Sequence, residues 1–325
     1  MFFLTKLLIS IVLGPVGFFV LPHQGASYAI MQPGTARNPL VAVLLPLSAE
    51  QALQQAQAVN TIPADFVPYR NWGITVPDID AKAAVVIGAR SGKVFYERNF
   101  RTRLPVASLT KLATALAILD ELGIDEEVMV SQRAVSTEGD FGGMVVGEAL
   151  SVYDLLRAML IASSNDAAVA LAEHVQKSRG KNLVELMNAK AYALGLADTR
   201  FTSVTGLEDA RNYSTAEDIA RFLNTAMQQE ILSEIMKTAS TDIRSVDGRF
   251  VHRLTTSNKL LGRFDGVVAG KTGYTTGAGG SLGVLAKNSK ADDDFLVVVL
   301  GSTNEETRFS SVELLITWVN EAYKW

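Results

Sequence analysis

Three short segments of the sequence carry residues that could perform nucleophilic chemistry. The first runs from Ser108 to Lys111, where a serine and a lysine stand three positions apart. On a helix this spacing puts both side chains on one face, so that the hydroxyl and the amine can meet. A serine hydroxyl becomes an effective nucleophile when a neighbouring base takes its proton. A lysine buried at the start of a helix, with another cation nearby, loses its charge more readily and can be that base.

The second segment holds Ser163 and Asn165, which follow an apolar helical stretch. On an irregular segment between helices, a hydroxyl and an amide at this spacing can point into one cleft. Ser163 could relay a proton to a leaving amine, and Asn165 could hold a substrate amide and position Lys111. The alternative interpretation is that Ser164 or Asn165 caps the next helix.

The third segment runs from Lys271 to Gly273 and is flanked by glycines and β-branched residues, which indicates the start of a strand. Glycine on an edge strand lets a ligand backbone come close, and an extended peptide could pair with such a strand. Lys271 could also be the second cation near Lys111. The alternative is a glycine-bounded strand end with a solvated lysine.

Each of these patterns is weak alone, because the sequence repeats two of them elsewhere. Ser178 and Lys181 also stand three apart, but Gly180 disfavours a helix there, and we interpret this segment as a loop. Ser302 to Asn304 repeats the serine-x-asparagine pattern. For the first segment the plain alternatives are a helix cap and a solvated helix lysine. The order of the three segments and the sequence around them therefore determine whether they form one site.

The strands that must position these segments are predicted at both ends of the folded region. Runs of β-forming residues at 83–87 and 94–96 flank a glycine turn, and runs at 280–286 and 295–300 flank a polar turn. Each pair predicts a hairpin. The sequence between the two hairpins has mostly helical patterns.

The helical patterns begin at the first catalytic candidate. Apolar residues from Leu109 to Leu116 repeat as in an amphipathic helix, and capping boxes are predicted at Ser151 and Ser214. The stretch 305–323 predicts a closing helix. We therefore expect an α+β fold, an antiparallel sheet flanked by helices with an inserted all-helical lobe.

Composition excludes several classes of protein. Hydrophobic residues make up 48% and charged residues 20%, which is typical of a globular chain, and a net charge of −4 gives no reason to expect nucleic-acid binding. Cysteine is absent, which excludes disulfides, thiolate catalysis and Cys-ligated metals. The three histidines, His23, His174 and His252, have no zinc-binding spacing. We expect no metal or cofactor.

The N-terminus indicates export. After Lys6 an apolar stretch extends to Leu21, and small residues follow at Ala26 to Ala29. We predict that residues 1–29 form a signal peptide or an N-terminal membrane anchor. Residues 30–78 are predicted to be a linker with a short helix, and 79–325 a catalytic domain.

Taken together and in order, the three segments resemble the motifs of penicillin-recognising serine acyltransferases. The surrounding sequence is similar to the D-alanyl-D-alanine carboxypeptidases, the low-molecular-mass penicillin-binding proteins. The similarity rests on 105–111, 159–167, 265–266 with 270–275, and the stretches 201–207, 213–216 and 258–261. It covers about Ala83 to Trp318.

The resemblance implies a role for each site residue. Ser108 would be the acyl-forming nucleophile and Lys111 its base, while Ser163 and Asn165 line the cleft. The implied substrate-binding residues are Lys271, Thr272, Gly273, Tyr274 and Arg308. Backbone N–H groups of Ser108 and Tyr274 would form the oxyanion hole. Arg308 has a plain alternative as a solvated surface charge.

The same resemblance implies the partners, which are peptidoglycan stem peptides as substrates and β-lactam antibiotics as covalent inhibitors. The family often has glycine where this chain has Ser164. Larger members add a β-rich domain and a C-terminal anchor, so here we expect any membrane attachment through the N-terminus.

Rival functions remain open at this point. A D,D-endopeptidase would cut crosslinks with the same residues, and a serine β-lactamase would need an added base for water, for which Glu185 is the candidate. Because Glu185 falls in a helical pattern over 183–194, a helix that flanks the core is the preferred interpretation. A catalytically silent cell-wall binding protein is disfavoured, since a binder needs no nucleophile and base.

Overall fold

The computed structural model describes residues 10–13, 16–19, 68–139, 142–207 and 209–325. The chain divides into two units, Met1–Pro68 and Tyr69–Trp325. In the first unit, β1 (Ser10–Leu13) and β2 (Val16–Phe19) pair antiparallel. The rest of the predicted signal or anchor, and the short helix predicted in the linker, which the sequence pattern places at 48–59, lie outside the described residues. Of the helices that the structure describes, none has both the length and the apolar character needed to cross a membrane.

The second unit is built on a five-stranded antiparallel sheet with the order β10-β11-β12-β4-β5. Its strands come from both ends of the unit, as the two predicted hairpins require. The strands are β4 (Ala83–Gly88), β5 (Val94–Arg98), β10 (Val267–Thr275), β11 (Gly279–Ala286) and β12 (Phe295–Ser302). The predicted α+β fold is confirmed.

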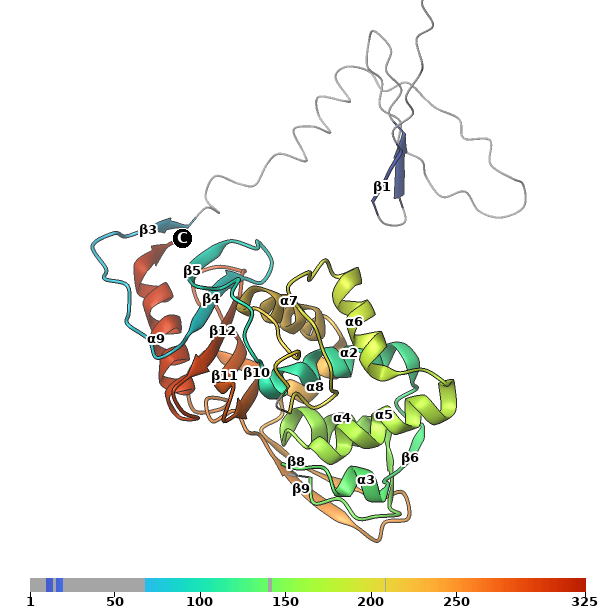
Figure 1. Cartoon of the computed structure of the whole chain (residues 1–325). Coiled ribbons are helices and arrows are strands. Elements are labelled where there is room, and N and C mark those ends of the chain that lie inside the picture. The colour runs from blue at the N-terminus through green and yellow to red at the C-terminus, as the bar shows by residue number, and fades with distance from the viewer. Residues whose placement is uncertain (1–9, 14–15, 20–67, 140–141, 208) are drawn as a thin grey trace, which may run out of the picture. The chain divides into compact units, whose positions relative to one another are not determined.

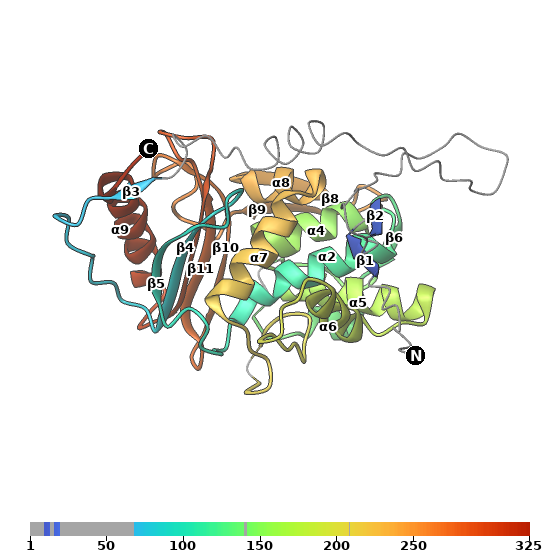
Figure 2. The same cartoon turned by 90° about the horizontal axis from the view of Figure 1, so that it is seen from above.

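Strand β12 shows how the sheet forms two cores. Phe295, Val297 and Val299 pack with α9 (Thr307–Ala322) on one face, whereas Leu296, Val298 and Leu300 belong to the core on the other face. Successive side chains of a strand point to opposite faces, so a strand buried on both sides is apolar throughout. Figures 1 and 2 show α9 on one side of the sheet and the other helices on the opposite side.

The helical lobe lies between β5 and β10 in sequence. It contains α2 (Lys111–Glu121), α3 (Gln132–Val135), α4 (Val152–Ile161), α5 (Asn165–Arg179), α6 (Leu183–Ala193), α7 (Ala216–Met227) and α8 (Glu230–Lys237). Short antiparallel pairs complete the unit: β6 (Glu127–Met129) with β7 (Ala149–Ser151), β8 (Ser240–Arg244) with β9 (Val251–Thr255), and β3 (Tyr69–Arg70) with β13 (Tyr323–Lys324).

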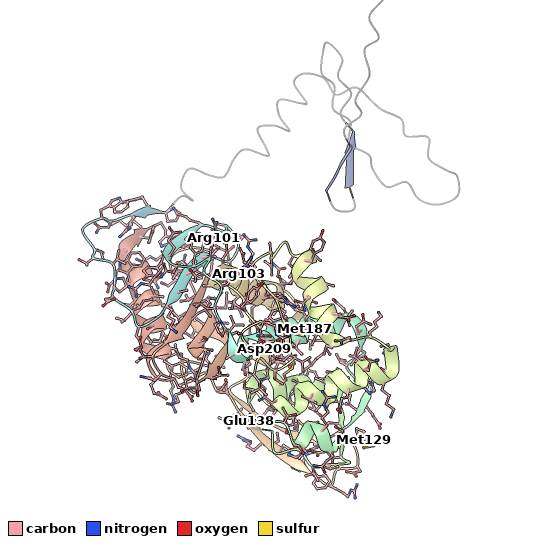
Figure 3. The ribbon with its side chains drawn as sticks, viewed as in Figure 1. Arg101, Arg103, Met129, Glu138, Met187 and Asp209 are labelled. Carbon is pink, nitrogen blue, oxygen red and sulfur yellow. The ribbon has the colours of Figure 1, made fainter. Side chains whose placement is uncertain are left out.

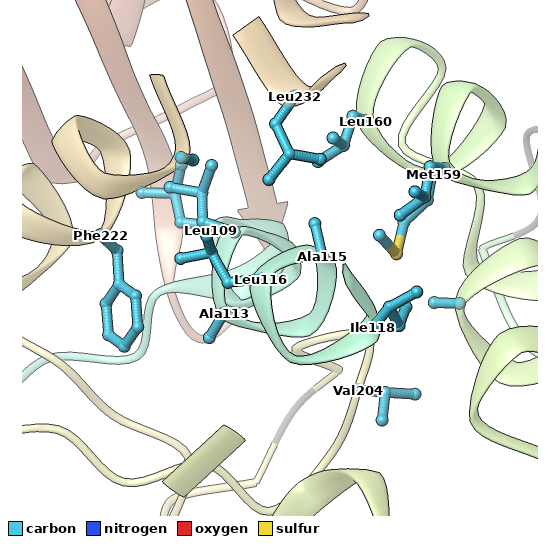
Figure 4. Close-up of a cluster of buried hydrophobic side chains, with 14 of the residues drawn as sticks. Leu109, Ala113, Ala115, Leu116, Ile118, Met159, Leu160, Val204, Phe222 and Leu232 are labelled. Carbon is cyan, nitrogen blue, oxygen red and sulfur yellow. The ribbon is translucent and has the colours of Figure 1, made fainter. Parts of the chain in front are cut away.

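Helix α2 differs from its predicted amphipathic character. Every residue from Lys111 to Ile118 is buried. Figure 4 shows why: apolar side chains such as Met159, Val204 and Phe222 surround the helix from several elements. The small residues Ala113, Ala115 and Ala117 let these neighbours approach, so α2 forms the centre of the lobe rather than its surface.

Two local predictions are corrected. The N-cap of α7 is Thr215, whose hydroxyl accepts from Asp218 N, and not Ser214, which lies one residue earlier and is buried. Ser178 belongs to the last turn of α5 rather than to a loop. The helix ends at Gly180, which takes the left-handed conformation common at helix ends. By contrast, Ser151 caps α4 as predicted.

Candidate active site

Ser108 lies in a 3-10 turn, η2 (Ala107–Thr110), that leads directly into α2. Its side chain caps neither helix, and it is partly exposed. Ala107 has a φ of 46°, a strained conformation for a residue with a β-carbon. The turn therefore presents the hydroxyl to solvent just before the buried helix begins.

Lys111, predicted to meet Ser108, is fully buried, so the interpretation as a solvated lysine is wrong. Its Nζ lies 2.8 Å from Ser108 Oγ, 2.6 Å from Asn165 Oδ1 and 3.4 Å from the carbonyl oxygen of Thr205. Burial lowers the pKa of Lys111 to about 7, although the nearby carboxylate of Asp166 acts to raise it. An amine with this pKa is partly neutral near pH 7 and can accept a proton.

The second segment forms the turn between α4 and α5. Ser164 caps α5 by accepting from Ala167 N, which leaves Ser163 and Asn165 for other contacts. Ser163 has a φ of 66°, and its hydroxyl lies 2.7 Å from Lys271 Nζ. Asn165 Nδ2 donates to the carbonyl oxygen of Glu138 at 2.6 Å, which turns Oδ1 towards Lys111.

The third segment lies inside β10 rather than at its start, because the strand already begins at Val267. β10 is an edge strand of the sheet, as predicted. Lys271 is buried, and burial lowers its pKa well below its usual value, helped by the positive charges of Lys111 and Arg308. Strand and helical lobe thus bring two amines and two hydroxyls into one cluster.

Gly273 allows β10 to approach Ser108. A β-carbon at this position would lie 2.9 Å from the carbonyl oxygen of Val106 and 3.0 Å from the backbone nitrogen of Ser108. Any larger residue would therefore push the strand away from η2. The next residue, Tyr274, is exposed on the strand, and the hydroxyl of Thr272 lies 2.6 Å from that of Ser257.

Arg308 is only 4% exposed, so the interpretation as a solvated surface charge is wrong. Its Nη1 donates to the carbonyl oxygen of Gly273 at 2.8 Å, and Nη2 lies 3.4 Å from Glu305. Burial lowers the pKa of Arg308. The guanidinium thus lies behind β10, beside the part of the strand that contacts Ser108.

Three contributors to the site were not predicted from sequence. Thr205 and Glu138 contribute backbone carbonyl groups, and the type of a residue does not indicate such a contact. Asp166 is fully buried and accepts hydrogen bonds from Ser164 Oγ, Ala167 N and Met144 N. Its position next to Asn165 was the one available signal, because a carboxylate in an otherwise apolar helix start needs partners.

The assembled site pairs a partly exposed hydroxyl with the buried amine of Lys111, next to the second buried amine of Lys271 and the guanidinium of Arg308. Such an arrangement can activate a serine and bind a carboxylate. Within the residues that the structure describes, no group of three or more His, Cys, Asp or Glu side chains could hold a metal. The fold and the site have the form of a serine acyl-transfer enzyme.

Comparison with known proteins agrees with this class. The family model described as D-alanyl-D-alanine carboxypeptidase matches residues 71–304. The D-alanyl-D-alanine carboxypeptidases DacF of Bacillus subtilis and DacC of Escherichia coli are both 34% identical to the chain, over 75% of its length. A D-alanyl-D-alanine endopeptidase of Pseudomonas aeruginosa is 32% identical over 74% of the chain.

Solved structures show the same fold. The Streptomyces K15 DD-transpeptidase has a TM-score of 0.71 at 26% identity, covering 76% of this chain and 99% of that one. The D-alanyl-D-alanine carboxypeptidase of Mycobacterium tuberculosis H37Rv has a TM-score of 0.70 at 27% identity, covering 77% and 94%.

The chain belongs to the D-alanyl-D-alanine carboxypeptidase family. It spans 63% of the length of the B. subtilis relative and 62% of the length of the E. coli relative DacC, and 78% of the P. aeruginosa endopeptidase.

Proposed function

We propose that this protein is a serine D-alanyl-D-alanine carboxypeptidase, which removes the terminal D-alanine from peptidoglycan stem peptides through an acyl-enzyme on Ser108. The observation that carries the proposal is the 2.8 Å distance between Ser108 Oγ and the Nζ of the buried Lys111. Family membership supports the substrate class.

Acylation begins at Lys111. Asn165 Oδ1 and the Thr205 carbonyl accept the N–H groups of the neutral amine, so its lone pair is directed to the third partner, the Ser108 hydroxyl. Oγ attacks the carbonyl carbon of the penultimate D-alanine while its proton passes to Nζ. The backbone N–H groups of Ser108 and Tyr274 stabilise the oxyanion.

Collapse of the tetrahedral intermediate breaks the C–N bond. The leaving D-alanine amine takes the proton that Lys111 received from Ser108, relayed through the Ser163 hydroxyl beside Lys271, so Lys111 is neutral again. A water molecule then gives a proton to Lys111 and attacks the ester, which releases the shortened peptide and restores Ser108.

The terminal carboxylate of the substrate binds at the positively charged end of the site. Arg308, whose guanidinium is hydrogen-bonded to the Gly273 carbonyl, supplies the positive charge. Lys271, whose lowered pKa favours the neutral amine, and the hydroxyl of Thr272 add hydrogen-bond donors. Gly273 leaves room for the substrate backbone to run along the edge of β10.

An endopeptidase is the second candidate, because relatives named D-alanyl-D-alanine endopeptidases are 32% and 28% identical to the chain. The β-lactamase alternative is disfavoured, since Glu185 is exposed on α6 and, among the residues that the structure describes, no hydrogen bond joins it to the site. We also propose that the enzyme is exported, with β-lactams as covalent inhibitors.

Product analysis tests the proposal. The full chain is incubated with a stem pentapeptide ending in D-Ala-D-Ala and, separately, with crosslinked muropeptides. We expect free D-alanine from the first and no release of monomers from the second. Monomer release without free D-alanine would establish the endopeptidase instead. A fluorescent penicillin that fails to label the protein, or labels Ser108→Ala equally well, would contradict both.

A further inference from the structure

The helical lobe contains a buried glutamate–histidine pair that the proposed mechanism does not use. The side chain of Glu148 is 0% exposed and that of His252 is 9% exposed, and His252 Nε2 lies 2.8 Å from Glu148 Oε2. Glu148 directly precedes β7, whereas His252 lies in β9. Figure 3 shows Met129, whose strand partner Ala149 follows Glu148, at the end of the lobe away from the sheet.

The second oxygen of Glu148 binds a short turn that also binds Asp166. Glu148 Oε1 accepts from Val145 N at 2.6 Å, and the preceding backbone nitrogen, that of Met144, donates to Asp166 Oδ2 at 3.3 Å. We call residues 144–148 the lobe turn. Two buried carboxylates thus accept from consecutive N–H groups of this turn. The positions of Glu148 and Asp166 therefore depend on each other.

Asp166 connects the lobe turn to the amine of Lys111. Burial lowers the pKa of Lys111, and the negative charge of Asp166 opposes this effect. The residue before Asp166 is Asn165, whose Oδ1 lies 2.6 Å from Lys111 Nζ. A displacement of the lobe turn would therefore move the groups that orient Lys111. A displacement of about 1 Å near the reacting atoms can lower a rate by about 100-fold.

His252 links the lobe turn to the opposite side of the site. Five residues further along the chain, Ser257 N donates to the carbonyl oxygen of Ile161 at 3.1 Å, and Ser257 Oγ lies 2.6 Å from Thr272 Oγ1. The segment that contains β9 is thus fixed at Ser257 beside β10 and at His252 against Glu148. Through this segment, the pair connects the surroundings of Thr272 with those of Asp166.

We infer that Glu148 and His252 are positioning residues for acylation, which hold the lobe turn against Asp166 and so keep Asp166 and Asn165 in place around Lys111. This inference rests on the proposed function. A buried carboxylate is costly unless its oxygens are hydrogen-bonded. Loss of the imidazole would therefore shift Glu148 towards another donor and displace the turn that it binds.

Acylation by benzylpenicillin tests the inference in Glu148→Ala. Stopped-flow measurements at several penicillin concentrations separate the dissociation constant of the first complex from the rate constant of acylation. We expect the rate constant to fall by about 10-fold to 100-fold and the dissociation constant to change by less than about threefold. A role in stability alone would reduce the fraction of protein that is labelled and leave both constants unchanged.

Two further variants separate positioning from the loss of a side chain. Glu148→Gln keeps an oxygen for Val145 N and supplies an amide to the imidazole, so its acylation rate constant should lie within about threefold of that of the unaltered chain. His252→Ala should lower the rate constant as Glu148→Ala does. The double variant Glu148→Ala/His252→Ala should be no slower than the slower single variant, because the pair acts as a unit.

The matched control is His174→Ala. His174 Nε2 lies 3.3 Å from Glu126 Oε2, which is another histidine–glutamate contact of the helical lobe, but neither residue contacts the lobe turn by a hydrogen bond among the residues described. The two side chains are 18% and 30% exposed. This variant should acylate at the rate of the unaltered chain.

Unchanged acylation rate constants in His252→Ala and Glu148→Ala would overturn the inference while leaving the proposed function intact. A loss in Glu148→Gln as large as that in Glu148→Ala, or additive losses in the double variant, would overturn it as well. His252→Ala leaves the bond between Glu148 and Val145 N in place and decides the question if Glu148→Ala does not fold. If benzylpenicillin fails to acylate the unaltered full chain, the proposed function is wrong and this inference falls with it.

Discussion

The proposed chemistry of this site depends on two amines that are buried away from water. Lys111 and Lys271 are both buried, and each contacts a serine hydroxyl at 2.7–2.8 Å. Burial alone would make a lysine a permanently neutral base, whereas the Asp166 carboxylate partly restores the affinity of Lys111 for a proton. The balance keeps its pKa near the pH at which it must both accept and return a proton.

The rate of acylation should therefore follow the titration of Lys111. Below about pH 7 the amine is protonated and cannot accept the Ser108 proton, so the second-order rate constant with benzylpenicillin should rise with pH. It should level off above about pH 8. Stopped-flow measurement of acylation between about pH 5 and 9 checks this, and a rate that is flat below pH 7 would contradict it.

Asp166→Asn should move this rise to lower pH. The carboxylate favours the charged form of Lys111, so its removal lowers the pKa of the amine. The change in midpoint separates this electrostatic effect from a loss of packing, which would lower the rate at all pH values alike. The control is Asp292→Asn, because the Asp292 side chain is 91% exposed. This variant should leave the midpoint of the pH profile unchanged.

At the scale of elements, glycines let separate segments approach the residues of the candidate site. Gly206 has a φ of 82°, and a β-carbon there would overlap the carbonyl oxygen of Ala107, next to Ser108. Gly139 has a φ of 71°, and a β-carbon there would lie 2.9 Å from Asn165 Nδ2. The loops that carry these glycines hold η2 and the Asn165 amide in position.

Gly206→Ala should thus slow acylation and lower the free energy of unfolding by about 2–4 kcal/mol, the sum of left-handed strain and overlap with η2. Gly248→Ala is the matched control, because Gly248 has a φ of 72° but open space around it. It should cost about 1–2 kcal/mol and leave the acylation rate unchanged. Urea unfolding and penicillin acylation of both variants test this. Equal effects of the two substitutions would contradict a role for the close approach of Gly206 to η2.

Helices and strands could be predicted where the local sequence pattern determines them. The two hairpins, the Ser151 cap and the closing helix follow from residue type and spacing alone. The burial of α2 did not, because a helix at the centre of a lobe has apolar neighbours on all sides and its sequence pattern is weak. The backbone carbonyl groups that accept hydrogen bonds from Lys111 and Asn165 could not be predicted either, since every residue type has the same carbonyl group.

At the scale of the whole molecule, the two ends of the second unit close on each other. β3 pairs with β13, and Asn71 N donates to the carbonyl oxygen of Ala322 at 2.7 Å. Phe95, Tyr323 and Trp325 form an aromatic cluster beneath this pair. The folded unit begins at Tyr69, within the range 30–78 that the sequence analysis assigned to a linker.

A chain that starts at residue 69 should therefore be more stable than one that starts at 79. The shorter chain loses the β3–β13 pairing, the Asn71 hydrogen bond and the packing of Ile74 on the core. We expect its free energy of unfolding to be lower by about 2–4 kcal/mol. Urea unfolding of both chains measures the difference, and equal midpoints would show that β3 contributes nothing.

The family was recognisable from sequence because three motifs recur in order, and the fold agrees. The positions of the charged side chains were harder to predict from the sequence. The sequence placed Arg308 near the end of the chain with a possible surface role, whereas the structure buries it behind β10 against Gly273. Contacts between the last helix and an edge strand form only when the sheet is complete. No local sequence pattern therefore predicts them.

The most direct test of the account is to locate the acyl group. The protein is trapped with benzylpenicillin, digested and analysed by mass spectrometry. We predict one adduct, on the peptide that contains Ser108, its absence in Ser108→Ala, and a fall of about 10³-fold or more in D-alanine release by that variant. An adduct on another residue, or undiminished D-alanine release by Ser108→Ala, would contradict the central claim.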